Sequence, residues 1–360
     1  MKRIISILMI LCLALSVTGC AELVSTEEKE VKVVIGGTVL MTNNELILLQ
    51  HLPLDVKIAK TKLRIREWVD YYGLDSVYVS FSGGKDSTVL LHIAKSIFPN
   101  IQYMYVDTGL EYPEIRQFVM SGGNGQFDID TLDIVKPDMT FIEVLKKYGY
   151  PLVSKEVSKN IQYGRKALDR GDTEKYERYV LGKRKGYSLY PIPKRWLPLF
   201  NNRDIPVSNQ CCTVMKKKPA HQYEQKTGRY AILGDMASDS SERKNRYLRN
   251  GGCNAFSQGR PISNPMGFWT EQDVFQYIRQ FNIDICSVYG SLVDNGVGCL
   301  KCSGVNRTGC VFCCFGLHLQ SEPNKFQLLH KTHPKLWEYC MYNKNINLSE
   351  ILDFLEISYK

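Results

Sequence analysis

The stretch Ser82-Gly83-Gly84-Lys85-Asp86-Ser87 lies where a strand pattern changes into a helix pattern. Before it, Val77-Tyr78-Val79-Ser80-Phe81 is short, β-branched and aromatic, as a buried strand is, and residues 88–97 carry apolar residues at helical spacing. Paired glycines let the backbone turn sharply and approach an anion, and the first N–H groups of a helix favour negative charge. Lys85 adds a positive charge. The stretch therefore predicts a phosphate-binding loop, with a spacing that differs from the Walker loop.

The surrounding sequence predicts a parallel sheet. Residues 101–106 and 230–233 have the composition of further strands, and residues 141–148 have the apolar spacing of a helix. Alternating strands and helices favour an α/β fold, in which ligands bind at the carboxyl ends of the parallel strands. Ser82 and Asp107 are both predicted to lie at such ends.

Several segments resemble one known family. The loop resembles the PP-loop of the adenine nucleotide alpha-hydrolase-like superfamily, and segments 106–114, 234–243 and 264–278 resemble, in matching order, motifs of its phosphoadenosine phosphosulfate (PAPS) reductase family. These segments contain Asp-Thr-Gly, Gly-Asp-Met-Ala-Ser-Asp-Ser-Ser-Glu-Arg, and Asn-Pro-Met followed by Trp-Thr-Glu-Gln-Asp-Val. Met236 stands where the family usually has arginine, so one anion contact is expected to be missing.

The resemblance implies a Rossmann-like PP-loop domain in an enzyme of sulfur metabolism. It also implies binding of an adenine nucleotide, which is either a sulfonucleotide or ATP, the latter together with Mg²⁺. The residues that match the nucleotide-binding motifs are Ser82, Gly83, Gly84, Lys85, Asp86, Ser87, Asp107, Gly234, Ser240 and Arg243.

The cysteines predict a metal centre in the second half of the chain. Apart from those in the first twenty residues, every cysteine lies at or after Cys211. An adjacent pair and two C-x-x-C pairs are typical of reduced thiolates around a metal rather than of disulfides. The six candidate ligands are Cys211, Cys212, Cys299, Cys302, Cys310 and Cys313.

Two metals are consistent with these cysteines. Cys211-Cys212 and the Cys299/Cys302 pair resemble the set that holds a [4Fe-4S] cluster in the adenylyl-sulfate branch of the reductases, and Cys310/Cys313 is a second candidate pair. The alternative is zinc held by the two C-x-x-C pairs. Lys216-Lys217-Lys218 could offset the negative charge of a cluster.

The catalytic residues stay unassigned. Reductases of this family carry a nucleophilic cysteine in a Glu-Cys-Gly-Leu/Ile-His motif near the carboxyl terminus, and that motif is absent here; Cys314 and Cys340 match it only in part. Three functions therefore remain open. They are reduction of a sulfonucleotide, ATP-dependent thiolation of an acceptor such as DNA or RNA, and non-catalytic nucleotide or redox sensing. A sulfur donor or a thioredoxin-like protein is an expected partner.

Charge is concentrated in one segment. The chain carries a formal net charge of +9, and residues 155–195 hold 12 Lys or Arg against 5 Asp or Glu. Tyrosines and a tryptophan are interleaved with these charges up to Trp196. Such a mixture suits phosphate contacts with base stacking, so residues 155–196 are a candidate nucleic-acid surface. The alternative is a solvated helical hairpin that attracts a small anionic nucleotide.

The amino terminus conflicts with the rest of the chain. Lys2-Arg3, an apolar run and Val17-Thr18-Gly19-Cys20 have the form of a lipoprotein signal peptide. An ATP-consuming enzyme with clustered thiols instead needs a reducing cytoplasm. Gly36-Gly37 can be encoded by a ribosome-binding sequence, so translation is expected to begin at Met41, which gives a cytoplasmic protein without stable membrane association. Export as a lipoprotein is the alternative.

The predicted organisation is an α/β PP-loop domain with a basic insertion and a Cys-rich, mostly helical carboxyl-terminal region. Its five parts are a signal-like or misassigned upstream segment (1–40), the nucleotide-binding core (41–154), the basic aromatic insertion (155–206), the remainder of the reductase-like core (207–282), and the Cys-rich region with a helical tail (283–360).

Overall fold

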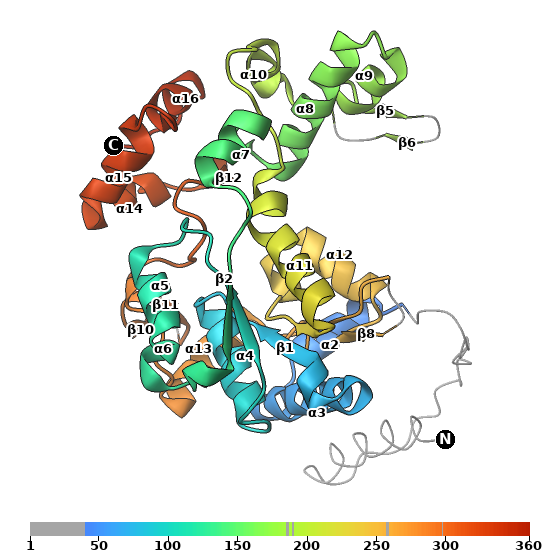
Figure 1. The fold of residues 1–360 in the computed structure, drawn as a ribbon, viewed down its shortest axis with the longest axis vertical. Helices are drawn as coiled ribbons and strands as arrows, with labels where there is room; N and C mark the ends of the chain where they lie inside the picture. The colour runs from blue at the N-terminus through green and yellow to red at the C-terminus, as the bar shows by residue number, and fades with distance from the viewer. Residues whose placement is uncertain (1–39, 185–186, 189–190, 257–258, 297) are drawn as a thin grey trace. The chain divides into compact units, whose positions relative to one another are not determined.

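A mainly parallel sheet carries the predicted phosphate loop (Figure 1). The computed structural model describes residues 40–184, 187–188, 191–256, 259–296 and 298–360, so the signal-like segment lies outside the described residues. Within them, the sheet has six strands, all parallel to their neighbours except β8. In spatial order the strands are β3 (Leu132–Val135), β2 (Tyr103–Val106), β1 (Val77–Ser80), β7 (Tyr230–Ile232), β9 (Ile262–Ser263) and β8 (Asn254–Ala255).

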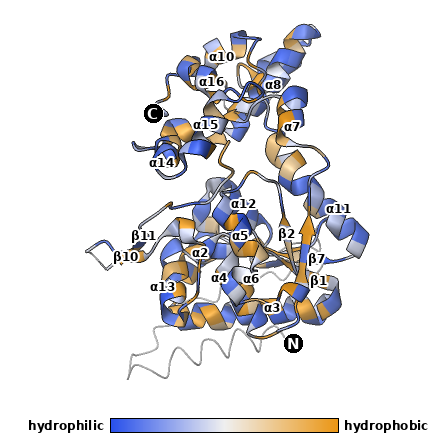
Figure 2. Ribbon diagram, turned by 60° about the vertical axis from the view of Figure 1, so that its left-hand side comes forward, coloured by the Kyte–Doolittle hydropathy of each residue, from blue (hydrophilic) through white to orange (hydrophobic). Residues whose placement is uncertain are grey.

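The two faces of the sheet are covered by different helices. Alternate residues of a strand point to opposite faces: Val77 and Val79 of β1 join the main core, while Tyr78 packs in a smaller cluster with Tyr223 of α11 (Lys218–Thr227). The main-core face is covered by α3 (Leu54–Tyr72), α4 (Lys85–Lys95) and α13 (Glu271–Phe281). Figure 2 shows the resulting apolar strands between more polar helices. Because β1 is buried on both faces, its sequence from Val77 to Val79 is apolar without alternation.

The remaining helices connect these strands or border them. Thr140 and Glu143 form a capping box at the start of α7, which begins and ends at the predicted residues. No helix within the described residues is both long and apolar enough to span a membrane. These other helices are α2 (Asn43–Gln50), α5 (Pro113–Met120), α6 (Gly122–Gly125), α7 (Phe141–Tyr148) and α12 (Ser241–Arg249).

The predicted insertion forms a small helical unit around a buried arginine. Its elements are α8 (Lys155–Asp169), α9 (Thr173–Tyr179), the hairpin of β5 (Lys183–Arg184) and β6 (Tyr187–Ser188), and α10 (Leu197–Asn201). Arg165 of α8 is 7% exposed and donates to the carbonyl oxygens of Phe200, Asn202 and Ile205 at 2.7–3.0 Å, and also to that of Leu199. The guanidinium thereby satisfies the unpaired carbonyls at the end of α10.

Replacing Arg165 with methionine is expected to destabilise the protein by about 2–4 kcal/mol, because it leaves several buried carbonyls without a donor. Urea unfolding measures the change. Arg170→Met at the exposed end of the same helix is the control, expected to lie within about 0.5 kcal/mol of the parent. Equal stability of the two variants would show that the guanidinium does not hold the insertion together.

The Cys-rich region contains short strands, although its many turn residues suggest irregular structure. β10 (Leu292–Asp294) pairs antiparallel with β11 (Leu300–Cys302), and β12 (Cys314–Phe315) pairs parallel with β4 (Leu152–Val153). The predicted helical tail is formed by α14 (Lys325–Thr332), α15 (Pro334–Tyr342) and α16 (Leu348–Phe354). Pairing of β12 with β4 places the Cys-rich region beside the start of the insertion.

Candidate functional site

The phosphate loop (residues 82–87) closes on itself through its two serines. Ser87 Oγ donates to the Gly84 carbonyl at 2.8 Å, accepts from the Ser82 amide at 3.2 Å, and lies 3.1 Å from Ser82 Oγ. Gly83 has a φ of +71°, and a Cβ there would lie 2.8 Å from Val119 Cγ2. Only glycine fits this position without strain. Gly84 is the N-cap of α4 and residues 85–87 form its first turn, so the first amides of the helix lie at the predicted anion site.

The side chain of Lys85 is buried beneath the loop. It is 3% exposed, and its ammonium lies 3.0 Å from Glu271 and 3.4 Å from Asp86. Burial opposes the charge, but the carboxylates of Asp86 and Glu271 outweigh it and raise the pKa of Lys85. Lys85 is therefore charged and paired with carboxylates in this structure, and it ties α13 to the phosphate loop.

A segment from the Cys-rich region lies against the same loop. The Lys85 amide donates to the Tyr289 hydroxyl at 3.2 Å, and that hydroxyl lies 2.7 Å from Thr308 Oγ1. The Lys85 ammonium also reaches the Asn306 carbonyl at 3.5 Å. A Cβ on Gly84 would contact both Thr308 and Tyr289 at 3.4 Å. Residues 306–308 therefore border the mouth of the phosphate loop.

Arginines of two elements meet on a pair of aspartates near the loop. Gly234 packs directly against the start of α4, because a Cβ there would lie 3.5 Å from Ser87. Beyond it, Arg243 pairs with Asp235 at 3.0 Å and with Asp239, and Arg307 pairs with Asp239 at 3.0 Å. The Arg307 side chain is 60% exposed. It is thus a solvent-accessible cation one residue from Thr308, which contacts the loop.

Two other residues of the predicted nucleotide site have structural partners. Ser240 is the N-cap of α12, where its hydroxyl accepts from the Arg243 amide at 3.3 Å. Asp107 follows β2, is 8% exposed and pairs with Arg116 at 3.1 Å. Met236, at the position where the family usually has arginine, is 1% exposed and belongs to the core.

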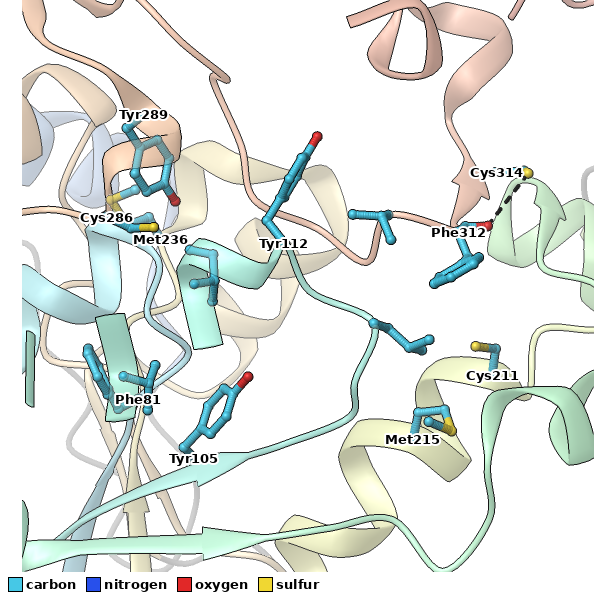
Figure 3. Close-up of a cluster of buried hydrophobic side chains, with 14 of the residues drawn as sticks. Phe81, Tyr105, Tyr112, Cys211, Met215, Met236, Cys286, Tyr289, Phe312 and Cys314 are labelled. Atoms are coloured by element: carbon cyan, nitrogen blue, oxygen red, sulfur yellow. Dashed lines mark hydrogen bonds between the residues drawn. The ribbon is translucent and has the colours of Figure 1, made fainter. Parts of the chain in front are cut away.

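Four of the six candidate cysteines face one small cavity. Cys211, Cys212, Cys310 and Cys313 line a nearly closed space of about 10 Å³, together with apolar side chains and Lys216. We call this the thiol cavity. Figure 3 shows Cys211 and Met215 beside Phe312, which forms part of its wall. Val311 donates to the Leu110 carbonyl at 2.7 Å, which fixes the Cys310/Cys313 turn against the segment after β2.

Cys299 and Cys302 lie elsewhere. They belong to the β10–β11 hairpin, where Cys299 is exposed and Cys302 is buried near the charges of Lys85 and Glu271. The structure therefore groups Cys211-Cys212 with Cys310 and Cys313, the pair that the sequence ranks second. The predicted zinc set is likewise divided, since only one of its C-x-x-C pairs lines the cavity.

Burial sets the charge state of most thiols at the cavity. It raises the pKa of the Cys211 and Cys212 thiols, and raises that of Cys310 to about 11, which favours the protonated form of these three thiols without a metal. Lys216 pairs with Glu111 at 3.0 Å and is the one lysine of the 216–218 run among the lining residues. Within the described residues no three Cys, His, Asp or Glu side chains already adopt a metal-binding arrangement. The donor set itself, four thiols in an apolar wall, fits either a [4Fe-4S] cluster or zinc.

The remaining cysteines are buried in the core. Burial raises the pKa of Cys314 and of Cys340 to about 12 each, and Cys253 and Cys286 belong to the main core. A thiol with so high a pKa is a poor nucleophile near neutral pH. Neither partial match to the reductase motif is therefore poised to attack a substrate.

Sequence reasoning missed Glu271, Tyr289 and Arg307 as neighbours of the loop. Glu271 begins α13, and the other two lie in the Cys-rich region, more than 200 residues after the loop. Only Glu271 lies inside one of the segments that resemble family motifs, and no local pattern marks a residue that acts through a distant contact.

The comparisons with known proteins agree with this fold. The model of the phosphoadenosine phosphosulfate reductase domain matches residues 76–186 and 191–305. An adenosine 5'-phosphosulfate reductase of Staphylococcus haemolyticus is 22% identical over 287 residues, covering 74% of this chain and 90% of that protein.

Two solved structures are also similar, both at low TM-scores. The PAPS reductase of Candida auris has a TM-score of 0.37 and 16% identity, covering 73% of this chain and all of that one. The U34-tRNA thiolase of Methanococcus maripaludis, solved with its [4Fe-4S] cluster, has a TM-score of 0.36 and 13% identity, with 82% and 80% covered. The family model covers more than half of the chain, which therefore belongs to the phosphoadenosine phosphosulfate reductase family.

Proposed function

We propose that this chain is an ATP-dependent sulfur-transfer enzyme that binds ATP at the phosphate loop and holds a metal at the thiol cavity. The observation that carries the proposal is the segment 306–313. Its first residues, Asn306 and Thr308, contact the loop or the Lys85 beneath it, and Cys310 and Cys313 line the thiol cavity. Nucleotide chemistry and sulfur chemistry would thus occur in adjoining parts of one site.

The phosphates of ATP would be bound by backbone and by one exposed cation. The first amides of α4 provide donors and a favourable dipole. Arg307 would exchange part of its contact with Asp239 for a phosphate oxygen, because its guanidinium is exposed while the ammonium of Lys85 is occupied by carboxylates. Mg²⁺ would accompany the ATP phosphates.

The thiol cavity would hold a [4Fe-4S] cluster through its four cysteines, with Lys216 offsetting negative charge. Because the four cysteines would ligate all four irons, such a cluster would supply electron transfer rather than an open iron. Zinc at the same thiols would instead make the centre structural.

The reaction we favour uses two displacements. An oxygen of the acceptor attacks the α-phosphorus of ATP and pyrophosphate leaves. Sulfide then attacks the activated atom of the acceptor and displaces AMP, which carries that oxygen away and leaves the sulfur on the acceptor. Reduction of a sulfonucleotide, the activity named for the Staphylococcus relative, needs a reactive cysteine. Burial of Cys314 and Cys340 weighs against it.

A nucleic-acid acceptor is favoured by the insertion. Tyr163 of α8 and Tyr179 of α9 stack with centroids 5.1 Å apart, and Tyr163 is 38% exposed. Lys166 of α8 and Lys175 of α9 are exposed, and the Arg178 guanidinium lies over the Tyr179 ring, 5.4 Å from its centroid. Stacked aromatics within a basic surface are suited to single-stranded nucleic acid.

The test is product analysis on anaerobically purified full-length chain. With ATP, Mg²⁺, sulfide and cellular RNA or DNA, the proposal expects pyrophosphate and AMP release with sulfur entering the nucleic acid. Sulfite released from a sulfonucleotide would replace the proposal with the reductase function. Binding of ATP without any product would identify a nucleotide sensor.

Arg307→Ala is expected to weaken ATP binding about tenfold or more, because it removes a charge-assisted hydrogen bond. Isothermal titration with a non-hydrolysable ATP analogue measures this. Arg203→Ala is the matched control, since Arg203 is 43% exposed and pairs with Asp169 in the insertion at the same 3.0 Å. An unchanged affinity in Arg307→Ala would remove Arg307 from the nucleotide site.

A further inference from the structure

A second pocket opens at the carboxyl ends of β2 and β3. Its volume is about 520 Å³, within the range of small-molecule sites. It is lined by the segment 107–110 after β2, by residues 136–143 after β3, and by Phe312, Tyr339 and Ile346. The lining residues include none of residues 82–87 but do include Asp107, a predicted nucleotide ligand, so the pocket adjoins the predicted nucleotide site.

Three aromatic rings form one wall of this pocket. Phe141 and Phe312 lie with centroids 5.0 Å apart, and Tyr339 meets Phe312 edge-on at 6.1 Å. Phe141 and Phe312 are buried, whereas Tyr339 of α15 is 46% exposed. An exposed ring supported by two buried ones offers a face on which a planar heteroaromatic group can stack.

The charged groups of the pocket favour an anionic ligand. Its three carboxylates are already engaged: Asp107 by Arg116, Asp138 by Lys218 at 2.6 Å, and Glu143 in the capping box of α7. Lys136 is exposed and makes no ion pair within the described part of the chain. The Arg116 side chain is 54% exposed. Because Arg116 is already paired with Asp107, Lys136 is the one unpaired cation among these lining residues, and it lies beside the stacking face, where a phosphate next to a stacked base would be in reach.

The pocket adjoins the thiol cavity. Leu110, Phe141 and Phe312 line both spaces, so one layer of side chains separates a ligand in the pocket from the cysteines. The segment 107–110 also leads from β2, the neighbour of β1 in the sheet. A ligand here would lie beside both the thiols and the carboxyl end of the sheet.

We propose that this pocket binds one base and the adjacent phosphate of a single-stranded nucleic acid, the sulfur acceptor. The inference rests on the proposed function, since it names the acceptor of that reaction. Tyr339 would stack on the base, and Lys136 would contact the phosphate. The basic insertion would hold more distant nucleotides.

The test measures the affinity of fluorescently labelled single-stranded RNA and DNA oligonucleotides for the full-length chain by anisotropy, across a range of salt concentrations. Tyr339→Ala should weaken binding roughly tenfold or more, while Tyr339→Phe should retain it because stacking needs the ring alone. Lys136→Ala should reduce the slope of log affinity against log salt concentration by the amount expected for about one lost phosphate contact. Tyr342→Ala is the matched control, because Tyr342 is 49% exposed on the same helix and does not line the pocket.

Binding of the ATP analogue is measured on the same variants. Unchanged ATP affinity in Tyr339→Ala together with weakened oligonucleotide binding supports the inference. Loss of ATP affinity in Tyr339→Ala would mean that the pocket holds the adenine of ATP, which overturns the inference and leaves the proposed function standing. Equal oligonucleotide affinity of Tyr339→Ala and the parent, or no binding by the parent, overturns it as well. Failure of the proposed function itself would be seen separately, because the parent protein would then bind no ATP or release no pyrophosphate.

Discussion

Serine at Cys310 and Cys313 is expected to abolish metal binding, whereas alanine at Cys299 and Cys302 should leave it intact. Only the first pair faces the thiol cavity with Cys211 and Cys212. Serine hydroxyls are poor substitutes for thiolates at iron or zinc. Iron, acid-labile sulfide and zinc are assayed on the same anaerobic sample, and about four irons with four sulfides per chain would indicate a cluster.

The two double variants serve as controls for each other. Cys302 is buried and Cys299 is exposed, whereas Cys310 and Cys313 are both half-buried, so a thermal melt of each variant is needed to separate loss of metal from loss of the fold. The opposite result, with metal lost on changing Cys299 and Cys302 and kept on changing Cys310 and Cys313, would mean that the hairpin pair completes the site. One zinc per chain without iron would be consistent with the same four cysteine ligands and would identify the centre as a structural zinc site.

The second large effect is expected for Gly83→Ala. Alanine there would adopt a positive φ and place Cβ 2.8 Å from Val119 Cγ2 and 3.0 Å from Ile115 Cγ2. The backbone strain costs about 1–2 kcal/mol and the overpacking about 1–3 kcal/mol more. Because relief requires the loop to move, affinity for ATP should fall more than tenfold. Urea unfolding and titration with an ATP analogue measure the two effects.

Gly228→Ala separates backbone strain from the contact with Val119. Gly228 has a φ of +70°, almost that of Gly83, and a Cβ there would meet nothing within 4 Å. Its substitution should cost about 1–2 kcal/mol and leave ATP binding unchanged. If Gly83→Ala bound ATP as tightly as Gly228→Ala, residues 82–87 would not be the phosphate site.

Much of the fold followed from local sequence patterns. β1, β2 and β7 lie within or close to the predicted ranges, and α7 has the predicted ends. These elements depend on signals carried by neighbouring residues, such as β-branched runs and the Thr140–Glu143 capping box. The family resemblance was confirmed by the match over residues 76–305 apart from 187–190. The nucleotide and metal ligands named from the motifs stay predictions.

The paired cysteines show where local sequence stops being informative. Cys299/Cys302 and Cys310/Cys313 have the same spacing, so a motif cannot choose between them. The choice was made by contacts between distant residues, namely pairing of β12 with β4 and the hydrogen bond from Val311 to the Leu110 carbonyl. The same is true of Lys85, whose motif predicts a phosphate contact while Glu271, 186 positions later, pairs with its ammonium.

The sequence by itself determined the turn at residues 82–87, because glycine at a positive φ between a buried strand and a helix is a local requirement. That this turn binds phosphate stays a prediction. The sequence also determined that reduced thiols gather in the second half of the chain. Only the tertiary structure decided which thiols meet, which cation is exposed at the loop, and that an aromatic pocket adjoins the thiol cavity. Those outcomes depend on packing between segments far apart in the chain, which residue spacing does not encode.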